Sequence, residues 1–191
     1  MSTLSLQSYA ERARLLESDT LASGRRIMDT TVMLHLRPYV LSALSIRPHD
    51  TLLDIGSGIG VLTNTLADFC RVVTAVDAEE VLARMPARAN VEKLPGDFLT
   101  MDMGERRYSR ILAYSMVHYL GSYEDVLALV DKAVGLLAPG GLFLLGDVPN
   151  DDYRTRAVST VEGQRLCLDI GVRLQQDEPE RRRLESVLKT P

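Results

Sequence analysis

The chain has 191 residues, of which 46% are hydrophobic and 25% are charged, and its formal net charge is −4 at pH 7. This length and composition suit one globular domain, and the acidic balance without a long basic run argues against a nucleic-acid partner. The chain has only two cysteines and no apolar run that reaches the length of a membrane span or a signal peptide. These features predict a cytoplasmic protein with free thiols and no membrane contact.

The predicted elements begin with helices and continue as an alternation. Residues 4–22 and 26–44 have helical apolar spacing, and we expect residues 1–45 to form a lid. Strands are predicted at 51–55, 72–76, 91–94, 110–114 and 142–146. Helices are predicted at 60–70, at 78–85 and from Ser122 to a stop at Pro139–Gly141. Residues 150–191 are predicted to be a helical C-terminal segment.

The predicted strands are continuous apolar runs, which is typical of parallel strands covered by helices on both faces. The sequence therefore predicts an α/β fold with a doubly wound, mostly parallel, Rossmann-like sheet. Residues 1–191 would form one domain, with residues 51–149 as its ligand-binding core. No strand is evident after residue 150. Since a bare edge strand favours aggregation, we expect the C-terminal helices or a second subunit to cover the last strand.

A glycine turn follows the first predicted strand. Gly56, Ser57, Gly58 and Gly60 separate that strand from a segment with helical apolar spacing. Such a turn lets backbone N–H groups at a helix N-terminus approach a ligand. In a dinucleotide-binding fingerprint the third glycine comes one residue later than Gly60. The spacing therefore disfavours a nicotinamide-dependent oxidoreductase, which stays as a minor alternative.

Carboxylates stand at the carboxyl ends of the predicted strands, where a parallel sheet binds its ligand. They are Asp54, Asp77, Asp97 and Asp147. Asp77 is placed to accept hydrogen bonds from ribose hydroxyls, which suits NAD and other adenosine ligands. Asp54 would repel a pyrophosphate but attract the ammonium and sulfonium groups of S-adenosylmethionine. The charge pattern therefore favours S-adenosylmethionine.

With these features the chain resembles the class I S-adenosylmethionine-dependent methyltransferases. The resemblance rests on five segments in order, which are residues 53–60, 76–77, 96–98, 113–120 and 137–141. It implies that the three turn glycines pass under the methionine part of the cofactor and that Asp77 holds the ribose. Asp97 and Phe98 would contact the adenine. The complete cofactor site would comprise Asp54, Gly56, Ser57, Gly58, Gly60, Asp77, Ala78, Asp97, Phe98, Tyr114, Ser115 and Met116.

The resemblance implies methyl transfer to a small-molecule acceptor, and we expect O-methylation of a metabolite or sugar. His118 is the candidate catalytic base, with a packing role as the alternative. No residues have metal-ligand spacing, so no metal is expected. The family usually adds a sixth and a seventh strand, and neither is evident here. This departure keeps a second function open, that of a non-catalytic S-adenosylmethionine-binding or assembly module.

Overall fold

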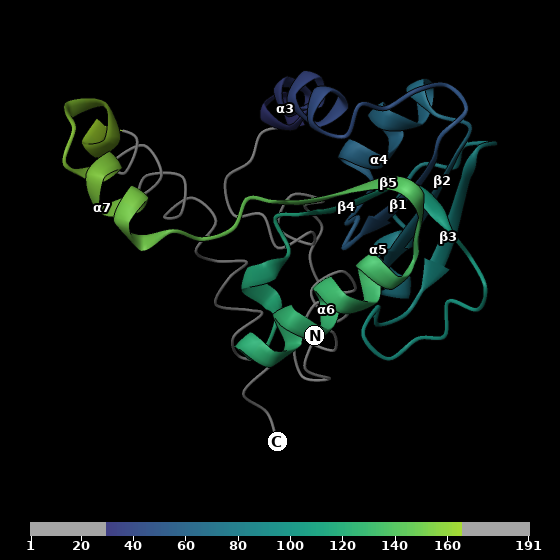
Figure 1. Cartoon of the computed structure of the whole chain (residues 1–191). Coiled ribbons are helices and arrows are strands. Elements are labelled where there is room, and N and C mark those ends of the chain that lie inside the picture. The colour runs from purple at the N-terminus through teal and green to yellow at the C-terminus, as the bar shows by residue number, and fades with distance from the viewer. Residues whose placement is uncertain (1–29, 166–191) are drawn as a thin grey trace.

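The structure, a computed structural model, describes residues 30–165 (Figure 1). Its helices and strands are α3 (Thr30–Ala43), β1 (Thr51–Ile55), α4 (Val61–Leu66), β2 (Val72–Asp77), α5 (Glu79–Leu82), β3 (Val91–Pro95), β4 (Tyr108–Tyr114), α6 (Tyr123–Gly135), β5 (Leu137–Gly146) and α7 (Asp151–Val158). Two short 3-10 helices, η1 (Ala67–Phe69) and η2 (Val117–Tyr119), follow α4 and β4. These elements build a layered core from which α7 projects.

The five strands form one sheet in the order β3-β2-β1-β4-β5. Every neighbouring pair is parallel, which confirms the predicted doubly wound fold. The strand order reverses between β1 and β4, so the crossovers from these two strands leave in opposite directions. A crevice for a ligand forms at the carboxyl ends of the strands at such a switch point.

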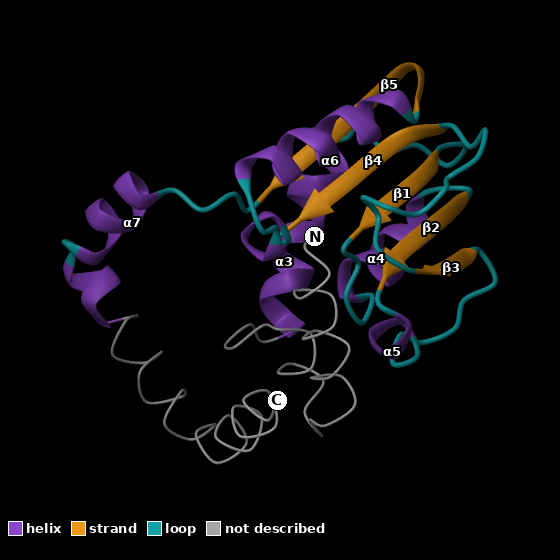
Figure 2. Cartoon of the chain, turned by 90° about the horizontal axis from the view of Figure 1, so that it is seen from below, coloured by secondary structure: helices purple, strands orange, loops and turns teal. Residues whose placement is uncertain are grey.

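Helices cover both faces of the sheet (Figure 2). On one face, Val40 of α3, Leu44 just after it and Leu66 of α4 pack in a buried cluster with Leu52 and Leu112 of the strands. On the other face, α6 contributes a second cluster with the neighbouring strands: Leu53, Ile55, Ile111, Ala113, Leu129 and Ala133. Alternate residues of β1 and β4 thus face opposite helical layers, as expected for strands buried on both sides.

The end of α6 and the start of β5 differ from the sequence prediction. We predicted that Pro139–Gly141 stops the helix, but α6 ends at Gly135 and β5 already begins at Leu137. The register between β4 and β5 shifts here, since Tyr108 pairs with Leu137 and Arg110 pairs with Leu142. The Pro-Gly-Gly segment is therefore an irregularity within an edge strand, where a residue without an N–H is tolerated.

The two terminal segments of the prediction lie mainly outside the described residues. Of the expected lid (1–45), only α3 and the turn after it are described, and α3 packs into the core. Of residues 150–191, the described part includes α7, which stands apart from the sheet in both views. The expectation that the edge of β5 is covered by the C-terminal segment or a second subunit stays a prediction.

A buried polar network joins the amino ends of β1 and β4. Asp50 is only 3% exposed and accepts hydrogen bonds from Ser109 Oγ at 2.8 Å and from the Arg47 N–H at 2.7 Å. Arg110 Nη2 lies 3.4 Å from Asp50 Oδ2. Burial alone raises the pKa of Asp50, but these hydrogen bonds and the Arg110 charge outweigh it and leave the pKa below its ordinary value.

Asp50→Asn is expected to lower the free energy of unfolding at neutral pH by about 2–3 kcal/mol. Because folding lowers the pKa of Asp50, its carboxylate stabilises the protein above the unfolded pKa, near 3.8. That contribution is lost as the pH falls through the folded pKa. Urea unfolding at neutral pH and at about pH 3 should therefore show a smaller pH dependence for the variant than for the wild type.

Asp68→Asn is the matched control, because Asp68 pairs with Arg88 at the surface. An exposed ion pair contributes little, so this change should cost under about 1 kcal/mol. Equal losses in the two variants would contradict the role of the Asp50 network.

Candidate functional site

Two cavities open at the carboxyl ends of the strands and share Gly56 as a lining residue. The first, of about 290 Å³, is lined by Ile55, Gly56, Val76, Asp77, Gly96, Asp97, Phe98, Leu99, Met116, Leu120 and Leu129. The second, of about 340 Å³, is lined by Asp54, Gly56, Ser57, Gly58, Ile59, Val61, Leu62 and Tyr114. Nine of the twelve expected cofactor-binding residues thus line a cavity, whereas Gly60, Ala78 and Ser115 line neither.

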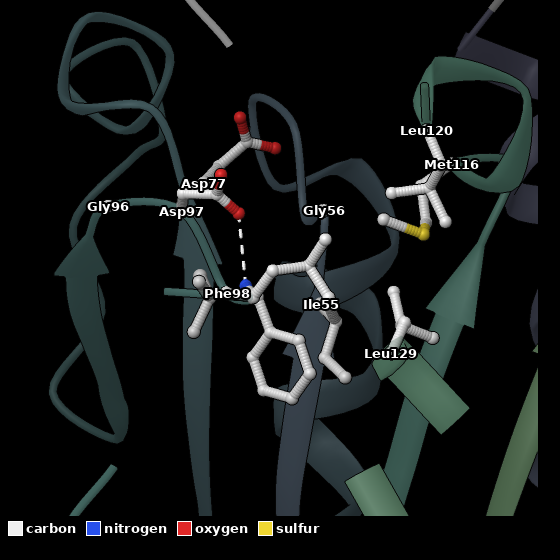
Figure 3. Close-up of a pocket in the computed structure, with 11 residues that line it drawn as sticks. Ile55, Gly56, Asp77, Gly96, Asp97, Phe98, Met116, Leu120 and Leu129 are labelled. Carbon is white, nitrogen blue, oxygen red and sulfur yellow. Dashed lines mark hydrogen bonds between the residues drawn. The ribbon is translucent and has the colours of Figure 1, made fainter. Parts of the chain in front are cut away.

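The first cavity has a polar side and an apolar base (Figure 3). Asp77 and Asp97 lie on one side, across from Met116 and Leu120. Ile55, Phe98 and Leu129 form the base. Leu120 and Leu129 are not among the cofactor-binding residues expected from the sequence. Leu129 has the signature of an ordinary core position on an amphipathic helix, so only the packing of α6 shows that it reaches the cavity.

The glycine turn between β1 and α4 has three left-handed residues, Gly56, Gly58 and Gly60, with φ angles of 70°, 59° and 82°. A Cβ on Gly56 would lie 2.9 Å from Met116 Cβ, and one on Gly60 would lie 2.5 Å from Met85 Cγ. A Cβ on Gly58 would meet nothing within 4 Å. A side chain at Gly56 or Gly60 would therefore force Met116 or Met85 to move, while Gly58 faces open space in the second cavity.

Asp77 connects the glycine turn to the end of β2. Its Oδ2 accepts the Gly58 N–H and its Oδ1 accepts the Ala78 N–H, both at 2.7 Å. The side chain is largely buried, with the residue 6% exposed. A carboxylate has about four lone-pair sites, so it can accept more hydrogen bonds than these two. Asp77 can thus shape the turn and still bind hydroxyl groups of a ligand.

Asp97 shapes the loop after β3 in a similar way. Its Oδ1 accepts the Leu99 N–H at 3.0 Å, and its backbone carbonyl accepts the N–H groups of Thr100 and Met101 at 3.1 and 2.9 Å. The loop turns back and buries the Phe98 side chain against the first cavity, where the residue is 4% exposed.

Asp54 supplies a buried carboxylate to the second cavity. The residue is 3% exposed, and its Oδ2 accepts a hydrogen bond from Thr63 Oγ1 of α4 at 2.6 Å. Because a buried carboxylate interacts strongly with a nearby cation, this cavity is suited to a positively charged group.

The ends of β4 and β5 place two strained residues side by side. Ser115 and Asp147 have positive φ angles of 57° and 54°, and the Ser115 N–H donates to the Gly146 carbonyl at 3.1 Å. Non-glycine residues in this left-handed region cost energy and are concentrated at functional sites.

His118, the expected base, lies exposed in η2 with its ring 4.0 Å from the ring of Tyr119, and it lines neither cavity.

Residues 30–165 contain no cluster of three or more His, Cys, Asp or Glu side chains able to hold a metal ion. In the same described range, no helix combines the length and apolarity needed to cross a bilayer.

Residues 53–145 match the family described as "Methyltransferase domain". Chondramide synthase cmdD of Chondromyces crocatus is 28% identical over 139 residues, which are 67% of this chain and 4% of that protein. A probable ribosomal RNA small subunit methyltransferase A of Methanosarcina mazei is 38% identical over 71 residues, 35% of this chain and 26% of that protein. This chain therefore spans only a small part of these two curated relatives.

Among solved structures, the N-methyltransferase NodS from Bradyrhizobium japonicum WM9 has a TM-score of 0.52 and 23% identity to this chain. The similarity covers 66% of this chain and 70% of NodS. At this level of identity the two proteins share a fold.

Proposed function

Residues 53–145 belong to the methyltransferase domain family, and on that premise we propose that this protein transfers the methyl group of S-adenosylmethionine to a small-molecule acceptor. The observation that carries the proposal is the pair of adjoining cavities at the switch point of the sheet. One cavity combines two carboxylates with an apolar base, and the other contains the buried carboxylate of Asp54.

The two cavities match the two ends of this cofactor. In the first, Asp77 is suited to the ribose hydroxyls, Asp97 to the adenine amino group and Phe98 to the adenine ring. In the second, Asp54 is suited to the positive charge at the methionine end. The remaining assigned residues are those of the turn and the strand ends: Gly56, Ser57, Gly58, Gly60, Ala78, Tyr114, Ser115 and Met116.

Bound S-adenosylmethionine supplies an electrophilic methyl group, so the main tasks of the protein are alignment and exclusion of water. The backbone of the turn and the strand-end carboxylates would fix the donor. A hydroxyl acceptor must also lose its proton, and we assign His118 as the candidate base. His118 lies in η2, which is separated from the end of β4 by two residues, so it follows the segment Tyr114–Met116 next to which we place the acceptor.

The acceptor we propose is a hydroxyl group of a metabolite or sugar. The net charge of −4 supports a small molecule over RNA. Calorimetry with S-adenosylhomocysteine tests the cofactor site, and absence of binding would contradict the proposal. Transfer of radiolabelled methyl groups should then be measured on fractionated metabolites and on ribosomal RNA. Label on RNA would contradict the acceptor class, and binding without any turnover would favour a non-catalytic module.

Asp54→Asn is expected to weaken binding of S-adenosylhomocysteine by about tenfold, because the neutral amide no longer attracts the ligand's ammonium group. The asparagine keeps the shape of the side chain and can still accept the hydrogen bond from Thr63. 5′-Methylthioadenosine, which lacks the amino-acid part, is the matched ligand and should bind both proteins equally. Equal losses for the two ligands in calorimetry would place Asp54 outside the methionine end of the site.

A further inference from the structure

The ammonium group of Lys132, in α6, contacts the loop that follows β3. Its Nζ donates hydrogen bonds to the carbonyl oxygens of Leu99 at 3.2 Å and Met101 at 2.5 Å. The same ammonium group lies 5.1 Å from the centroid of the Phe98 ring. One cation therefore contacts three residues of a single loop, and two of them, Phe98 and Leu99, line the first cavity.

The helix that carries Lys132 also forms part of the cavity wall. Leu129 lies one helical turn before Lys132, is fully buried and lines the first cavity. Burial lowers the pKa of Lys132, while the nearby charges of Asp97 and Asp102 act in the opposite direction. The ammonium group is thus partly withdrawn from water, where its contacts with carbonyl oxygens and with an aromatic ring are strengthened.

We propose that Lys132 is a positioning residue for the adenine end of the cofactor, because its ammonium group fixes the loop of residues 97–101 in the geometry that presents Phe98 and Leu99 to the cavity. The proposal rests on the proposed function. Without the ammonium group, two carbonyl oxygens lose their donor and the loop has to be ordered when the ligand binds. The cost of that ordering would appear as lost affinity.

The test compares Lys132→Met with Lys93→Met. Methionine retains an unbranched side chain but has neither the charge nor the donors. Lys93 is a matched control, since its Nζ also donates to two carbonyl oxygens, those of Leu82 at 2.9 Å and Met85 at 2.5 Å. These carbonyls belong to α5 and the turn after it, and Lys93 lines neither cavity.

Both variants should lose comparable stability in thermal unfolding, but only Lys132→Met should weaken binding of S-adenosylhomocysteine, by about tenfold in calorimetry. Wild-type affinity in Lys132→Met would overturn the proposal. An equal loss in Lys93→Met would overturn it as well, because the loss would then follow from general destabilisation.

A second measurement needs no ligand. The chain has three phenylalanines, so incorporation of 4-fluorophenylalanine gives three ¹⁹F resonances, which the variants Phe69→Leu and Phe143→Leu assign. Lys132→Met should shift or broaden the Phe98 resonance and leave that of Phe69 unchanged, whereas Lys93→Met should change neither. An unchanged Phe98 resonance would overturn the positioning role. If the wild type fails to bind S-adenosylhomocysteine, the proposed function fails while this measurement still reports on the loop.

Discussion

Gly58→Arg is expected to abolish binding of S-adenosylhomocysteine, with at least about a 100-fold loss of affinity, while the protein stays folded. A Cβ at this position meets no atom within 4 Å, so the fold has room for a side chain. That room is the second cavity, which the long side chain would fill. The guanidinium group would also compete with a ligand's ammonium group for the carboxylate of Asp54. Calorimetry measures the loss, and circular dichroism checks the fold.

Gly104→Arg separates the backbone cost of the change from its effect on the site. Gly104 has a φ of 58°, close to the 59° of Gly58, and a Cβ there also meets nothing within 4 Å. It lies in the exposed loop before β4, away from both cavities. In both variants the arginine at a left-handed position should lower the free energy of unfolding by the same amount, about 1–2 kcal/mol. Only Gly58→Arg should lose binding. Retained binding in Gly58→Arg, or its loss in Gly104→Arg, would contradict the assignment of the turn.

The order of the elements could be predicted because buried parallel strands have a strong sequence signature. The segments 51–55 and 72–76 are short, largely apolar runs bounded by polar or turn residues, and the structure places strands there. The start of β5 could not be predicted in this way. Pro139 and Gly140 are typical of a helix stop, and only the pairing of Leu137 with Tyr108 shows that the strand has begun before them. That pairing joins residues that are distant in sequence and leaves no local pattern.

The polar half of the site could be predicted for a topological reason. Parallel strands end at the same edge of a sheet, so Asp54, Asp77 and Asp97 come together once the strands are recognised. One apolar residue of the site, Leu129, comes from the crossover helix α6, where it has the same spacing as any core residue. Lys132 of the same helix has the sequence signature of a solvent-exposed residue. Their positions depend on how α6 packs against the loop after β3.

Asp77→Asn is expected to weaken binding of S-adenosylhomocysteine by roughly 100-fold, more than its loss of charge alone would produce. Each oxygen of the Asp77 carboxylate accepts a backbone N–H, one from Gly58 and one from Ala78. An asparagine offers one oxygen and one NH₂ group, so in either orientation its NH₂ faces an N–H donor. The turn must then move or leave a donor unsatisfied, and the site loses a ribose acceptor together with the shape of the turn.

Asp97→Asn is the comparison that isolates this effect. In the structure, Oδ1 of its carboxylate accepts the backbone N–H of Leu99. The amide oxygen of an asparagine can keep this bond, so the loop should survive and the loss of affinity should stay within about tenfold. Calorimetry on both variants, with thermal unfolding alongside, distinguishes the two cases. Similar losses for the two variants would mean that the carboxylates act only through their charge. A larger loss for Asp77→Asn would show that this residue binds the cofactor and also builds the turn that receives it.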